Sequence, residues 1–107
     1  MPKRSKSYES GLYERLRDPA YAKEYLRAAL EDDDEGSEAV FLLALCDTAK
    51  ANHMTYIAEA TGLNRESLYK MLSRRGNPGI NSLKAVLKAV GLELSVELAR
   101  EKASVQV

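Results

Sequence analysis

Residues 55–70, TYIAEATGLNRESLYK, decide the fold of this chain. We predict a short helix over 55–61 capped by Thr55, a tight turn at Gly62, and a second helix over about 65–73 capped by Asn64. Leu68 and Leu72 would lie on the buried face of that second helix. Two short helices joined by a glycine turn are the arrangement of a helix-turn-helix, which presents its second helix to the major groove of DNA.

The flanking sequence predicts further helices. Asp18 followed by Pro19 is typical of a helix start, so residues 19–30 should be helical. Apolar side chains should form a stripe along one face of this helix, and the last of them is Leu30. Ser37 should cap a central helix over 38–51, in which Val40, Phe41, Leu43, Ala44 and Leu45 make almost every face apolar. Residues 12–17 are expected to form a helical turn or a short helix, and Leu83, Val86, Leu87 and Val90 predict a last helix that ends at Gly91. The fold class is therefore all-α: a helix-turn-helix bundle of about five helices with an N-terminal helical extension.

Residues 92–98, LELSVEL, alternate strictly between apolar and polar side chains. This alternation predicts a short C-terminal strand, although Leu and Glu are also frequent in helices. A lone strand needs a partner from outside its own chain, either in a dimer ribbon or in another protein. The expected domain organisation is a flexible basic tail (1–11), a helical extension with an acidic linker (12–36), the DNA-binding domain (37–98) and a C-terminal tail (99–107).

The composition is that of a small globular protein. The chain has 107 residues, of which 45% are hydrophobic and 30% charged, so it is expected to form one domain. There is no apolar run of the length that a membrane span needs, and the N-terminus has no signal-peptide core. The single cysteine, Cys46, cannot form an internal disulfide, which favours a cytoplasmic location.

The net charge of zero hides a separation of sign along the chain. Between Glu9 and Glu38 there are ten acidic and four basic residues, a balance of −6, whereas between Asn64 and Val90 there are six basic residues and one acidic residue, a balance of +5. The basic part coincides with the expected recognition helix. A local field of this kind favours a polyanionic partner more than the total charge suggests.

The outward face of the second helix supplies the candidate DNA-binding residues. In the major groove, Arg side chains bind guanine and Glu side chains accept a hydrogen bond from the cytosine amino group. The base-reading candidates are Arg65, Glu66, Tyr69 and Lys70. Polar side chains at the helix ends suit the phosphate backbone. The phosphate candidates are Thr55, Asn64, Ser67, Arg74, Arg75 and Asn77.

No other pattern indicates an enzyme or a cofactor. The acidic run at residues 32–35 lacks the spacing of a calcium loop and is interpreted as a solvated linker, with a docking surface for a basic protein as the alternative. His53 has no ligand partner at metal-binding spacing and is expected at the surface or in a cap. Cys46 is expected to be a small buried residue. We therefore expect no catalytic residues, no metal and no cofactor.

Residues 57–69, IAEATGLNRESLY, are followed by Gly76-Asn77-Pro78 and by the stretch from Leu83 to Leu92. On these features residues 38–94 resemble the lambda-repressor-like (Xre/Cro) helix-turn-helix family. With residues 21–30 and 68–73 included, nearly the whole chain resembles addiction-module antidote proteins similar to the HigA antitoxins. The resemblance implies a dimeric antitoxin of a type II toxin-antitoxin module. Such a protein binds a small basic RelE/HigB-type toxin ribonuclease and represses its own operon at a palindromic operator.

Two alternatives remain open on the sequence. The chain could be a stand-alone Xre-type transcriptional regulator without a toxin partner. It could also be a protein-interaction module that does not bind DNA, in which case Arg65, Lys70 and Arg74 should be paired with acids such as those at 32–35.

Overall fold

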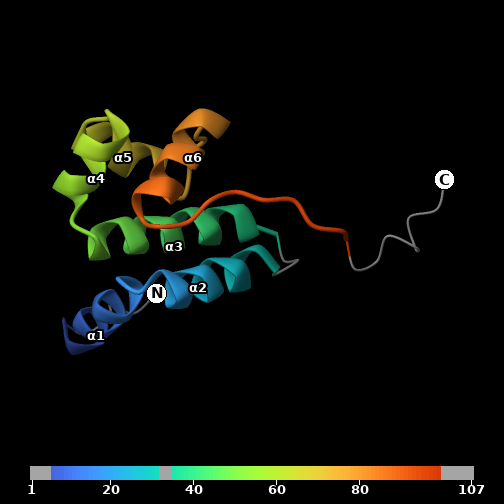
Figure 1. Ribbon diagram of the computed structural model, residues 1–107, viewed down its shortest axis with the longest axis horizontal. Helices are drawn as coiled ribbons and strands as arrows, with labels where there is room; N and C mark the ends of the chain where they lie inside the picture. Colours follow the sequence, from blue (N-terminus) through green and yellow to red (C-terminus); the bar gives the residue numbers. More distant parts are fainter. Residues whose placement is uncertain (1–5, 32–34, 100–107) are drawn as a thin grey trace.

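The computed structural model describes residues 6–31 and 35–99, and these residues form six α-helices and no strand. The helices are α1 (Lys6–Leu16), α2 (Pro19–Glu31), α3 (Ser37–Ala51), α4 (Met54–Thr61), α5 (Arg65–Met71) and α6 (Ile80–Ala89). α3 is the central helix: it contacts α1 and α2 on one side and α4 on the other, while α6 packs against α4 (Figure 1). The all-α fold class is confirmed.

Most of the core surrounds α3, which contributes six side chains to it. The main apolar cluster consists of Leu26, Ala29, Phe41, Leu42, Ala44, Leu45, Cys46, Ala49, Met54, Ile57, Leu68, Leu72, Val86, Leu87 and Val90. It joins α2 to the helix pair α4–α5 and to α6, so the position of α5 depends on contacts made through the whole domain. Burial of apolar surface on this scale is the main favourable term in folding.

A second, smaller cluster holds the N-terminal helix. Leu12 and Leu16 of α1 are one helical turn apart and pack on Ala22 and Ala51. Arg17 strengthens this corner, because its Nε donates a hydrogen bond to the Ala51 carbonyl at 3.0 Å. α1 is also longer than expected: residues 6–11, which we assigned to a flexible tail, are helical, and residues 1–5 lie outside the described ranges.

The starts of α2 and α3 differ in how well they were predicted. Asp18 caps α2 as expected, since its Oδ1 accepts a hydrogen bond from the Ala20 N–H at 3.0 Å. The expected cap at Ser37 is wrong, because Gly36 holds the N-cap position of α3 with φ of 91°. The Ser37 hydroxyl donates to the neighbouring Glu38 carboxylate at 3.2 Å instead of capping the backbone.

Two residues that were expected in the core are exposed, and the bounds of two helices differ from the predicted ones. Leu30 and Val40 are exposed, because no described helix lies over the end of α2 or the outer side of the first turn of α3. α5 ends at Met71, with Leu72 as its C-cap, so it is shorter than the expected 65–73. α6 begins at Ile80 and ends at Ala89, one residue before its C-cap, Val90.

The expected strand at residues 92–98 is wrong for the single chain. This segment runs along the molecule after α6 without regular secondary structure (Figure 1). A strand requires a neighbouring strand to complete its hydrogen bonds, and the described chain supplies none. None of the described helices is long and apolar enough to cross a membrane.

Candidate nucleic-acid interface

α4, the turn at Gly62 and α5 make up the segment in which the sequence predicts a helix-turn-helix. Gly62 adopts φ of 76°, a conformation that strains any residue with a side chain, and its N–H donates to the Ala58 carbonyl at 2.9 Å. Thr61 fixes the same corner: its hydroxyl donates to the Ile57 carbonyl at 2.8 Å and accepts from the Leu63 N–H at 3.3 Å. The direction of α5 relative to α4 is therefore set by hydrogen bonds within the turn.

The start of α4 differs from the expectation. Thr55 was predicted as the N-cap, but it is the second residue of the helix, which begins at Met54. His53 holds the N-cap position with φ of 67° and no side-chain capping bond. His53 is exposed, and no group of three or more His, Cys, Asp or Glu side chains among the described residues could hold a metal ion.

The start of α5 agrees with the sequence. Asn64 is the N-cap, with its Oδ1 accepting a hydrogen bond from the Ser67 N–H at 2.7 Å. Leu68 and Leu72 are fully buried beneath the helix. Anchoring on this side turns the opposite face of α5 toward solvent.

All ten candidate residues are exposed. They are Thr55, Asn64, Arg65, Glu66, Ser67, Tyr69, Lys70, Arg74, Arg75 and Asn77. Ser67, Lys70, Arg75 and Asn77 are brought together around a shallow pocket of about 360 Å³, which Met71, Gly76, Pro78 and Gly79 complete. Arg65, Glu66 and Tyr69 lie on α5 outside this pocket, and Thr55 stands apart on α4.

The cations of this surface are not neutralised by the described parts of the chain. Arg65, Lys70, Arg74 and Arg75 make no ion pair and no side-chain hydrogen bond with a described residue, whereas Arg27 pairs with Glu31 elsewhere at 3.4 Å. Of the acids at 32–35 that were considered as partners for these cations, Glu35 makes no ion pair with a described residue, and Asp32–Asp34 lie outside the described residues. Unpaired and exposed cations suit a polyanionic ligand.

Tyr69 has a neighbour that the sequence did not indicate. The Lys50 Nζ lies 5.7 Å from the centroid of the Tyr69 ring, a cation–π contact between α3 and α5. Lys50 is exposed and adds a further positive charge beside α5. The two residues are far apart in sequence and belong to different helices, so no spacing rule could have found the pair.

The loop after α5 carries three of the candidates and depends on Gly76. A Cβ at this position would lie 1.9 Å from the Met71 carbonyl oxygen, so the backbone passes too close for any side chain. The Gly76 N–H donates to the Ser73 carbonyl at 2.9 Å, and the Ser73 hydroxyl donates to the Lys70 carbonyl at 2.8 Å. These contacts fold Arg74 and Arg75 back beside the end of α5.

Comparison with known proteins gives a family. Residues 7–98 match the family described as "Probable addiction module antidote protein". An uncharacterized protein of Haemophilus influenzae (strain ATCC 51907 / DSM 11121 / KW20 / Rd) is 40% identical over 76 residues, which cover 71% of this chain and 75% of the relative. No solved structure matches the chain. Because the match spans nearly all of α1 and the whole of α2 to α6, the chain belongs to the addiction module antidote protein family.

Proposed function

We propose that this protein is the antitoxin of a type II toxin-antitoxin module and a sequence-specific DNA-binding repressor of its own operon. In this proposal it acts as a cytoplasmic homodimer that binds a palindromic operator and neutralises a small basic RelE/HigB-type toxin. Family membership supports the antidote role. The DNA-binding role rests on one observation: the exposed cations on and after α5 have no partner among the described residues.

The surface divides into two kinds of contact under this proposal. Arg65 and Glu66 occupy the first turn of α5, the part of a recognition helix that reaches base edges. A good side-chain contact to a base contributes roughly 1–3 kcal/mol of discrimination. Arg74 and Arg75 follow the helix and suit phosphates, which add affinity without sequence preference.

A gel-shift titration with the upstream region of the gene tests the DNA-binding role. Arg65→Ala should reduce the preference for the operator over unrelated DNA by about tenfold or more, because a base contact is lost. Arg74→Ala should weaken binding to all sequences and lower the slope of log affinity against log salt by about 1.

Arg15→Ala is the matched control. Arg15 is an exposed cation on α1 whose guanidinium lies 5.5 Å from the centroid of the Tyr21 ring, so its removal changes the net charge by the same amount without touching α5. If Arg65→Ala and Arg74→Ala bind the operator as the Arg15→Ala control does, the DNA-binding role is rejected. A dimer should also prefer half-sites about 10 base pairs apart.

The toxin-binding role is tested separately. The product of the neighbouring reading frame should copurify with this chain when the two are expressed together, and the antidote should suppress its toxicity. If no such frame exists, the stand-alone Xre-type regulator becomes the better description. If the operator is not bound either, the chain is a protein-interaction module, and Asp32–Asp34 would be the first place to look for partners of the α5 cations.

A further inference from the structure

Lys50 brings a positive charge to the surface of α5 from a helix outside α4 and α5. It lies in the last turn of α3, is exposed, and has its Nζ 5.7 Å from the centroid of the Tyr69 ring. This distance is within the about 6 Å over which an aromatic ring attracts a cation. The Tyr69 side chain is 39% exposed and makes no hydrogen bond with a described residue, so it meets Lys50 through its ring and not through its hydroxyl.

The charge of Lys50 is not neutralised by an ion pair with any described residue. The acid one turn earlier on α3, Asp47, is buried, and its Oδ2 accepts a hydrogen bond from the Tyr25 hydroxyl at 3.1 Å. An ammonium group has three N–H donors, and an aromatic ring meets it from one side only. The remaining donors of Lys50 are therefore available to an anion.

Tyr69 and Met71 mark the two flanks of α5. Successive residues of a helix are turned by about 100°, so these two residues lie on opposite sides of the outward Lys70. Met71 lines the shallow pocket of about 360 Å³ that Arg75 also lines. One flank of α5 therefore carries Arg75, and the other flank carries Lys50, which comes from a different helix.

A helix that lies in the major groove has a phosphate backbone beside each of its flanks. The helix with its side chains is about 10–12 Å across, and the major groove is about 12 Å wide. A helix of this width fills the groove from one backbone to the other. Cations on both flanks of α5 therefore match the two strands that border the groove.

We propose that Lys50 binds a phosphate of one DNA strand, that Arg75 binds a phosphate of the opposite strand, and that Tyr69 positions Lys50 for its contact. The proposal rests on the DNA-binding role proposed above and adds a contact from α3 to it. A lysine that already lies against a ring loses less freedom when it binds, so the ring increases the affinity of the contact. Tyr69, which the sequence assigned to base reading, then acts through Lys50.

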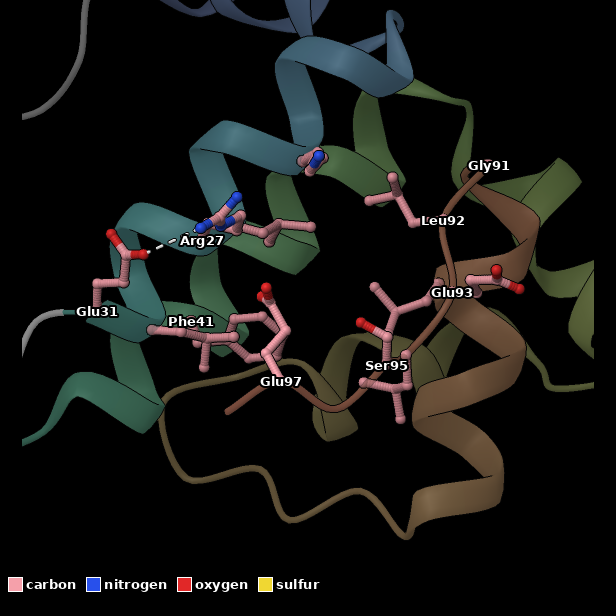
Figure 2. Close-up of a pocket in the computed structure, with 13 residues that line it drawn as sticks. Arg27, Glu31, Phe41, Gly91, Leu92, Glu93, Ser95 and Glu97 are labelled. Carbon is pink, nitrogen blue, oxygen red and sulfur yellow. Dashed lines mark hydrogen bonds and ion pairs between the residues drawn. The ribbon is translucent and has the colours of Figure 1, made fainter. Parts of the chain in front are cut away.

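A groove on another part of the molecule provides the matched control. It has a volume of about 690 Å³ and is lined by α2, α3, α6 and the chain that follows α6 (Figure 2). Lys23 is an exposed lysine of α2 that lines this groove, which Glu31, Glu93 and Glu97 also line. No residue of α4, α5 or the loop after α5 belongs to the lining. Substitution of Lys23 therefore removes the same charge as substitution of Lys50, at a surface of mixed charge away from α5.

A gel-shift titration at several salt concentrations tests the Lys50 contact. Lys50→Met removes the charge and keeps an unbranched side chain that favours a helix. Each phosphate contact adds about 0.9 to the slope of log affinity against log salt, so the advantage of wild type over Lys50→Met should shrink by about 3.5-fold per bound chain between about 50 and 200 mM salt. Lys23→Met should bind the operator with the affinity and the slope of wild type.

Two substitutions of Tyr69 test its positioning role. Tyr69→Phe keeps the ring and should retain the affinity and the salt slope of wild type. Tyr69→Leu removes the ring and should weaken binding by about two- to fivefold per bound chain. The loss caused by Lys50→Met should be smaller by the same factor when it is made in the Tyr69→Leu background. Equal losses in the two backgrounds would show that Tyr69 does not position Lys50.

Interference by ethylated phosphates tests the assignment to two strands. Ethylation of a contacted phosphate should block binding of the wild type at positions on both strands of each half-site. Lys50→Met should become insensitive to ethylation at a position on one strand, and Arg75→Met at a position on the other, while Lys23→Met should keep the wild-type pattern. Insensitivity of both variants on the same strand overturns the two-strand arrangement.

The titration also separates failure of this contact from failure of the DNA-binding role. If the wild type binds its operator and Lys50→Met behaves as Lys23→Met does, the Lys50 contact is overturned and the proposed repressor stands. A loss for Lys50→Met that is the same at every salt concentration reports a structural effect and overturns the contact as well. If the wild type does not bind its upstream DNA, the repressor and the contact are rejected together.

Discussion

Asn64 combines two tasks in one side chain. It caps α5 through its bond to the Ser67 N–H, and it lies exposed beside the first turn that the proposal directs at DNA. The same position therefore contributes both to the stability of α5 and to the polar surface that a phosphate would meet in the proposed complex. Two substitutions can separate these contributions.

Asn64→Ala should lower the free energy of unfolding by about 1 kcal/mol, because one N–H at the start of α5 loses its acceptor. Asn64→Asp should keep the stability, since Asp caps equally well and its charge suits a helix N-terminus. The Asp variant should nevertheless bind DNA more weakly than wild type. Urea unfolding, with an unchanged dependence of the unfolding free energy on urea concentration, would measure the effect on stability. A gel shift would measure the effect on DNA binding.

The control for this pair is Asn81→Ala, an exposed asparagine in the first turn of α6 that makes no side-chain hydrogen bond with a described residue. It should change stability by no more than about 0.5 kcal/mol. Equal losses for Asn64→Ala and Asn64→Asp would contradict the capping role.

At the scale of elements, α5 and the loop after it act as one unit. α5 has seven residues, too few to be stable alone, and Leu68 and Leu72 hold it to the core. The loop returns to the helix through Gly76, whose backbone passes against the Met71 carbonyl. The positions of Arg74, Arg75 and Asn77 therefore depend on this one close approach.

Gly76→Ala should destabilise the protein by about 1–3 kcal/mol and displace the loop, because the added Cβ would lie 1.9 Å from a carbonyl oxygen. The DNA affinity of Gly76→Ala should fall further than the DNA affinity of Arg74→Ala, since several of the proposed phosphate contacts would move together. Gly79→Ala is the control: its φ is −69° and a Cβ there meets nothing within 4 Å. Similar unfolding midpoints for the two variants would show that the loop can adapt.

At the scale of the whole molecule, α3 joins the two halves of the domain, and Cys46 lies within it. Burial raises the pKa of the Cys46 thiol from its usual 9.0; Asp47 also raises this pKa and Lys50 opposes the rise. The buried thiol can react only when α3 is exposed. Its reactivity therefore reports the opening of the entire core.

The thiol of Cys46 should react slowly with a disulfide reagent at pH 7 and rapidly in denaturant. A folded pKa above the unfolded value stabilises the fold fully below pH 9.0, and this contribution is lost as pH rises above 9.0 toward the folded pKa. The stability difference between wild type and Cys46→Ala should therefore be constant below pH 9 and decrease above it. Fast labelling of the folded protein would contradict the burial of this residue.

The helix caps, the glycine turn and the buried face of α5 could be predicted from the sequence, because each depends on residues that are close together in the chain. The Asp18 and Asn64 caps, the left-handed Gly62 and the buried pair Leu68 and Leu72 follow from side-chain chemistry and helical spacing within a few residues. The exposure of Arg65, Glu66, Ser67, Tyr69 and Lys70 follows from the same spacing, because fixing the buried face of a helix fixes the opposite one.

Other features were decided only when distant segments met. Lys50 reaches Tyr69 from another helix, and Leu12 and Leu16 of α1 pack on Ala51 at the end of α3. No periodicity encodes such contacts. The alternating segment at 92–98 is the clearest case. Alternation sets which side chains share a face, but a strand also needs a neighbour to accept its hydrogen bonds, and the folded chain offers none. The sequence alone thus determined most of the helices and which of their faces are apolar. The tertiary structure determined which of these faces are packed against another segment.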